Sequence, residues 1–181
     1  MNYLTPIFVL GLIFWPHPII AAEHKDQEPE GLLERKGDKL VEAPASDVAV
    51  ARTYRAFRNK GEVWEGLRMT ILTRKRRYKV GEPVRVIHVL ESVQKGVRMN
   101  LMGPEPICSE YVDGKLVDNK YCDGSRSVTG SIITHPVTNF NFDITTYRFN
   151  EPGEHTIRWK FRMHGDTGLQ SNLIDIHIEP K

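Results

Sequence analysis

From residue 64 onward, apolar and polar side chains alternate along the chain with a period of two. In the clearest stretch, Arg68 and Thr70 separate the apolar residues Leu67, Met69 and Ile71. Because successive side chains of a strand point to opposite faces, this period predicts strands. The predicted strands cover residues 67–72, 84–90, 97–101, 127–134, 140–149, 155–163 and 173–178. About seven strands between Gly, Pro, Asn and Asp clusters, with no convincing helix, are typical of an all-β, two-sheet sandwich of antiparallel strands.

The first 22 residues follow a different pattern. An uncharged apolar run from Leu4 to Trp15 is followed by two prolines and then by Ala21 and Ala22, ahead of Glu23. This order predicts a signal peptide over residues 1–22 with cleavage after the alanine pair. A retained membrane anchor is the alternative, but it needs about 20 apolar residues, and the prolines interrupt the run before that length. We therefore expect an exported protein, periplasmic or secreted, with no stable membrane insertion after cleavage.

Residues 23–63 have few large apolar side chains and many charged ones. Such a composition buries too little apolar surface to offset the entropy of ordering the chain, so it predicts a polar, largely disordered leader. Within it, residues 47–57 fit either a brief helix or an irregular lead-in to the first strand. The folded domain is then predicted over residues 64–181.

Three segments of that domain resemble sequence segments of bacterial extracellular immunoglobulin-like domains. They are Val80 to Val86 (VGEPVRV), Phe149 to Trp159 (FNEPGEHTIRW) and Ser171 to Ile176 (SNLIDI). The resemblance implies an immunoglobulin-like sandwich, in which Trp159 would fill the core. In that family a Tyr usually stands where this chain has His155 and bonds to a nearby backbone group at a corner, so the resemblance implies the same role for His155.

The overall charge narrows the choice of partners. Lys plus Arg is 25 and Asp plus Glu is 23, a net charge of +2, which argues against a general nucleic-acid binder. The densest basic run is Arg74, Lys75, Arg76 and Arg77, between two predicted strands. It is either an anion contact, for acidic polysaccharide, lipid headgroup or nucleic acid, or a solvated turn that blunts edge-to-edge association.

The chain has two cysteines, Cys108 and Cys122. In an oxidising compartment such a pair favours a structural disulfide. The intervening Asp113-Gly114 predicts a two-residue hairpin turn, in which strict pairing sets Cys108 against Asn119 rather than Cys122. The bridge then requires a bulge, a longer loop or a fold-back of the chain after Asn119.

Histidines supply the other candidate chemistry. His155, His164 and His177 lie on the last two predicted strands and are the candidates for a metal site, but their spacing fixes no ligand shell. His88 is in register with the apolar side chains of its strand, which predicts a core histidine with one hydrogen bond. We predict no catalytic residue, because no Gly-flanked nucleophile turn is present. We also predict no metal and no cofactor.

These patterns favour an exported, non-enzymatic binding or accessory module. It would recognise another protein or a cell-surface glycan through loops or an edge strand, and not nucleic acid. Two alternatives stay open. One is a small secreted hydrolase or metal-dependent enzyme, and the other is a periplasmic inhibitor or chaperone that acts by strand addition.

Overall fold

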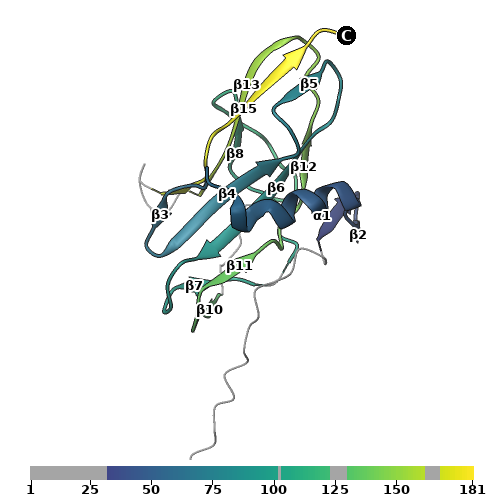
Figure 1. Cartoon of the computed structure of the whole chain (residues 1–181). Coiled ribbons are helices and arrows are strands. Elements are labelled where there is room, and N and C mark those ends of the chain that lie inside the picture. Colours follow the sequence, from purple (N-terminus) through teal and green to yellow (C-terminus); the bar gives the residue numbers. More distant parts are fainter. Residues whose placement is uncertain (1–31, 102, 123–129, 162–167) are drawn as a thin grey trace, which may run out of the picture.

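The computed structural model describes residues 32–101, 103–122, 130–161 and 168–181 (Figure 1). The predicted signal peptide, residues 1–22, lies outside them. Within these ranges two helical elements occur, α1 (Ala45–Arg52) and the short 3-10 helix η2 (Thr53–Ala56). The strands are β1 (Leu33–Lys36), β2 (Lys39–Glu42), β3 (Val63–Trp64), β4 (Leu67–Thr73), β5 (Arg77–Lys79), β6 (Val84–Ser92), β7 (Arg98–Met99), β8 (Glu110–Val112), β9 (Lys115–Leu116), β10 (Ser131–Ile132), β11 (Val137–Asn139), β12 (Thr145–Tyr147), β13 (Gly153–Phe161), β14 (Leu169–Gln170) and β15 (Ile174–Glu179).

Two sheets carry most of these strands. The five-stranded sheet has the order β11-β6-β4-β3, with β12 also paired to β6. The six-stranded sheet has the order β5-β15-β13-β8-β9, with β14 also paired to β13. Each neighbouring pair is antiparallel except β5 and β15, which run parallel. The prediction of an all-β fold is therefore confirmed, although the described strands are more numerous than the seven expected, because several short ones accompany the long ones.

The two large sheets share one hydrophobic cluster. Met69 and Val86, from β4 and β6, meet Ile157, Trp159 and Ile176, from β13 and β15, in this cluster. Trp159 is 5% exposed and contacts the rings of Phe142 and His88 edge-on. The prediction that Trp159 belongs to the core is confirmed.

The predicted disordered leader at 23–63 needs correction for residues 32–56. There β1 and β2 form a hairpin, and α1 and η2 follow it. Figure 1 shows α1 lying against the sheet that contains β4 and β6. Tyr54 is 2% exposed and packs with Leu72, Ile87 and Val89 of that sheet in a second cluster.

Charged residues of this N-terminal segment are paired with the body, which explains why a polar composition is ordered. Arg85 of β6 donates to Glu34 at 2.8 Å and to Asp47 at 2.7 Å. Arg35 of β1 donates to Asp143 at 2.8 Å. The two carboxylates that bind Arg85 belong to residues that are at most 9% exposed. From composition alone these groups are expected to be solvated, whereas in the structure they form partly buried ion pairs.

The free edge of β4 is covered by another part of the chain. The side-chain amide of Asn172 accepts from the backbone N–H of Ile71 at 2.9 Å and donates to the backbone O of Ile71 at 3.1 Å. It therefore supplies the two hydrogen bonds that a neighbouring strand would supply. A Cβ added at Gly61 would lie 2.1 Å from the backbone O of Met69, so the segment before β3 approaches this edge too closely for a side chain.

Candidate functional site

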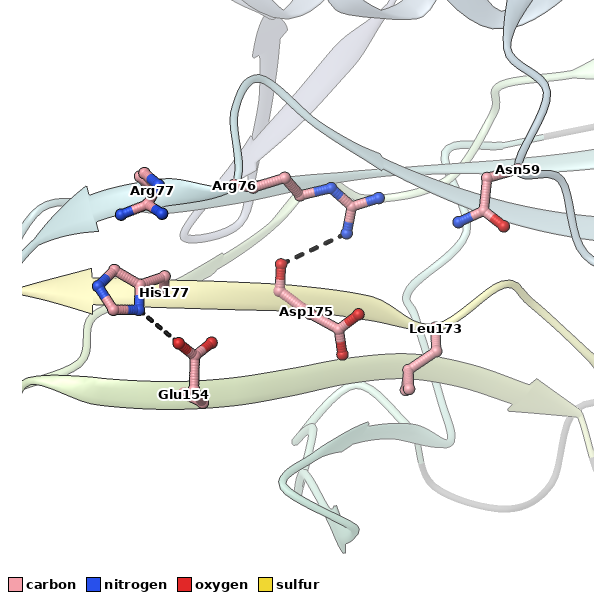
Figure 2. Close-up of a pocket in the computed structure, with 7 residues that line it drawn as sticks. All are labelled: Asn59, Arg76, Arg77, Glu154, Leu173, Asp175 and His177. Carbon is pink, nitrogen blue, oxygen red and sulfur yellow. Dashed lines mark hydrogen bonds and ion pairs between the residues drawn. The ribbon is translucent and has the colours of Figure 1, made fainter.

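A shallow pocket of about 300 Å3 lies on the outer face of the six-stranded sheet (Figure 2). The pairing of β5, β15 and β13 creates it, because Arg77, His177 and Glu154 stand opposite one another and form one row across three strands. The complete lining is Asn59, Arg76, Arg77, Glu154, Leu173, Asp175 and His177. Side chains two apart on one strand share a face, which places Leu173, Asp175 and His177 together.

Part of this polar lining is already paired. Nδ1 of His177 lies 2.5 Å from Oε1 of Glu154 (Figure 2). Arg77 donates to Glu179 at 3.3 Å, in a pair whose side chains are largely exposed. An exposed pair of this kind contributes about 0–1 kcal/mol, so Arg77 can exchange its partner for a ligand at little cost.

Other lining groups lack such a partner. Arg76 donates to the backbone O of Asp175 at 3.4 Å, a long contact, and no described carboxylate pairs with it. The Asp175 carboxylate has no hydrogen bond or ion pair with any described residue, and the same holds for the amide of Asn59. Leu173 adds an apolar wall and is 37% exposed. The pocket therefore offers a cation, an anion, an amide and an apolar surface to solvent.

The predicted anion-contact run divides between two environments. All four residues are exposed, and Arg76 and Arg77 line the pocket. Lys75 instead pairs with Glu82 at 2.6 Å and lies over the ring of Tyr78. The hydrogen bond from Lys75 is the largest cause that lowers the pKa of the Glu82 carboxyl. Arg74 lies in the bend between β4 and β5.

A second group of titratable side chains lies between the two sheets. His88 of β6 and Glu110 of β8 are 1% and 2% exposed, and Nε2 of His88 is 2.9 Å from Oε1 of Glu110. The hydroxyl of Tyr147 on β12 donates to the same carboxylate. Burial acts to raise the pKa of Glu110, but the charge of His88 and the hydrogen bonds from His88 and Tyr147 outweigh it, so this pKa is lowered. The phenol pKa of Tyr147 is raised by burial and by the Glu110 charge.

This cluster is a structural feature rather than an accessible site. The prediction for His88, a core histidine with one hydrogen bond, is confirmed, since Nδ1 has no partner among the described residues. Sequence analysis missed Glu110 and Tyr147, because a cross-sheet pairing leaves no local spacing pattern. It also missed Asn59, Glu154 and Asp175 in the pocket, since strand register decides which polar residues meet.

The structure joins Cys108 and Cys122 in a disulfide, with the two Cα atoms 5.8 Å apart. The predicted hairpin is present, with Val112 paired to Lys115. Of the three routes to the bridge, the structure shows the fold-back after Asn119, where the N–H of Cys122 donates to the O of Asn119 at 2.8 Å. In the chain-entropy model, closing a loop of this size stabilises the fold by about 3 kcal/mol.

His155 differs from its predicted role. Its Nδ1 lies 2.8 Å from Oδ2 of Asp113, and its ring stacks on Phe149 with centroids 4.0 Å apart. The expected corner bond to a backbone group is thus replaced by a bond to a side chain, because the turn between β8 and β9 places Asp113 opposite the start of β13. The same carboxylate accepts from the N–H of Thr156 at 2.8 Å.

The candidate metal-binding histidines do not converge in the described chain. His155 pairs with Ile176 across β13 and β15, so His177, one residue further, points to the opposite face. His164 lies outside the described residues. Nowhere in the described ranges do three or more His, Cys, Asp or Glu side chains group in a way that could hold a metal ion.

Comparison of the chain with known protein families, with curated proteins and with solved structures finds no match. The functional argument therefore depends on the residues and geometry described above.

Proposed function

We propose that the protein is an exported, non-enzymatic binding module, with an immunoglobulin-like sandwich as its body, which contacts another protein or a surface glycan through the pocket on β5, β15 and β13. The observation that carries the proposal is the lining of this pocket. Arg76 and Asp175 present opposite charges to solvent without a described carboxylate or cationic partner. Asp175 lies in β15, and the backbone O of Arg76 accepts from the N–H of His177 in the same strand at 2.8 Å, so the sheet fixes the backbone of both residues. A site with a fixed backbone loses less entropy on binding.

The location of the titratable groups supports binding over catalysis. The groups with the strongest mutual contacts, His88, Glu110 and Tyr147, lie in the core between the sheets. A substrate bound at the surface pocket does not reach them.

Strand addition has less support than the pocket. Beyond its pairing with β3, the edge of β4 is occupied by the amide of Asn172 and by the segment that contains Gly61. Edge strands β5 and β9 are three and two residues long, and short edges are a known protection against strand addition.

One observation, the disulfide, supports an extracytoplasmic location. The Cys108–Cys122 disulfide suits an oxidising compartment. In the ranges that the structure describes, no helix is long and apolar enough to cross a membrane.

The test is binding of the purified exported protein to the cell-envelope fraction of its source. We expect the Arg76→Ala, Asp175→Asn double variant to lose this binding. The matched control is Lys39→Ala with Asp38→Asn, which changes the same charges on the exposed β1–β2 turn. Equal envelope binding by the pocket variant and the wild type would refute the pocket as the contact site.

A further inference from the structure

The surroundings of the pocket carry an excess of unpaired positive charge. Arg58 adjoins the lining residue Asn59, and its side chain is exposed. Arg74 is exposed as well, but its charge helps to lower the pKa of Glu82, which does not line the pocket. Neither Arg58 nor Arg76 forms an ion pair with a described carboxylate. Of the two lining carboxylates, Glu154 is bound to His177, whereas Asp175 has no described partner. Two unpaired cations, Arg58 and Arg76, against one unpaired lining carboxylate attract a negatively charged ligand.

The acceptors inside the pocket restrict which anion fits. Asp175 and Glu154 bring carboxylate oxygens to the same surface as Arg76 and Arg77 (Figure 2). Ionised carboxylates only accept hydrogen bonds, so they favour a ligand that carries donors beside its negative charge. A phosphodiester group carries acceptors alone, so it leaves the lining carboxylates without a donor. Acidic sugars carry hydroxyl donors and an anionic group on one ring.

We infer that the pocket binds an acidic polysaccharide, with a sugar carboxylate or sulfate on Arg76 and neighbouring ring hydroxyls donating to Asp175. The inference rests on the proposed function and names the ligand of the same site. Asn59 can donate to or accept from a further hydroxyl, and Leu173 contacts the apolar face of the ring. A volume of about 300 Å3 stands at the lower end of small-ligand pockets, which suits a sugar unit of an extended chain.

The experiment measures binding of the purified exported protein to soluble polymers at low ionic strength. Polygalacturonate supplies uronates, dextran sulfate supplies sulfates, and dextran is the neutral counterpart of the sulfated polymer. We expect binding to one or both acidic polymers, weakening with added salt, and none to dextran. Binding to polygalacturonate alone identifies a uronate, and binding to dextran sulfate alone identifies a sulfated sugar.

Two variants separate hydroxyl recognition from charge attraction. Arg76→Ala should weaken binding by about tenfold or more, since it removes a charge-assisted hydrogen bond. Asp175→Ala should also weaken binding, although it removes a negative charge, because the ring hydroxyls lose their acceptor. Simple charge attraction predicts the opposite, tighter binding by Asp175→Ala. Both side chains lie on the surface, and unchanged thermal unfolding of each variant verifies that the fold is intact.

Several results would overturn the inference. They are tighter binding by Asp175→Ala, equal binding of dextran, absence of binding to both acidic polymers, and equal binding of single-stranded DNA or of vesicles with anionic phospholipids. A further outcome would overturn only the acidic polysaccharide as the ligand. In this outcome Arg76→Ala abolishes envelope binding, but an excess of acidic polymer does not compete with it. In that case the pocket would stand as the contact site for a partner of different chemistry.

Discussion

At the scale of single residues, the buried pair of His88 and Glu110 is the feature that most constrains this core. Two ionisable groups that are at most 2% exposed face each other beside the apolar cluster that the sheets share. Removing one partner of such a pair leaves the other without compensation, which is more costly than the net contribution of the intact pair. The pair therefore penalises any arrangement of β6 and β8 that separates these two residues.

The lowered pKa of Glu110 makes stability depend on pH. The folded state keeps this carboxyl ionised to lower pH than the unfolded chain, whose Glu pKa is about 4.3. Its contribution is therefore present above about pH 4.3 and is lost as pH falls through the folded-state value. We expect the wild type to lose more stability than Glu110→Gln between pH 6 and pH 3 in denaturant unfolding. Because both proteins share all other carboxylates, parallel pH profiles would contradict this prediction.

At the scale of elements, the period of two predicts where β4, β6, β13 and β15 lie but not which elements cover their sheets. Their bounds lie within a few residues of the predicted strands. Leu72, Ile87 and Val89 lie on the face opposite the shared core and are also buried. A strand that is apolar on both faces indicates a second covering layer, and this signal was present in the sequence. For the layer itself, the sequence left residues 47–57 open between a brief helix and an irregular lead-in, because so short a segment shows too few turns of a helical pattern. The structure has the helix, α1, followed by η2.

The pocket was predictable only in part. The basic run marked Arg76 and Arg77 as candidates because charge density is visible in the sequence. Asp175 and Glu154 join them only through the register of β13 and β15, and β5 joins through a parallel pairing. Neither the register nor the pairing follows from alternation, since a shift by one residue would exchange the faces of a whole strand.

The covered edge of β4 leads to a prediction at this scale. Asn172→Asp should destabilise the protein by about 1–3 kcal/mol, because the buried O of Ile71 loses its donor and faces a carboxylate. The matched control is Asn150→Asp, the same change at an exposed position, which should leave stability within about 0.5 kcal/mol. Urea unfolding of both variants gives the comparison. If the two variants unfold at the same urea concentration, the amide of Asn172 does not hold this edge.

At the scale of the whole molecule, the five-stranded sheet is a middle layer. Its inner face shares a cluster with the six-stranded sheet, and its outer face shares a cluster with α1, η2 and Leu32. The N-terminal segment is therefore part of the packed body rather than a tether. Its attachment differs from that of the sheets, because ion pairs from Arg85 contribute to it as well as apolar contacts.

This difference predicts separate loosening of the outer layer. Arg85→Ala leaves the partly buried carboxylates of Glu34 and Asp47 without their cation, and such groups regain water only if the segment moves away. We expect faster amide hydrogen exchange throughout α1, with protection in β13 and β15 retained, since local opening needs less free energy than global unfolding. Arg74→Ala, at an exposed bend, is the control and should leave exchange in α1 unchanged. Equal acceleration in α1 and β13 of the Arg85 variant would instead mean that the N-terminal layer and the sheets unfold as one cooperative unit.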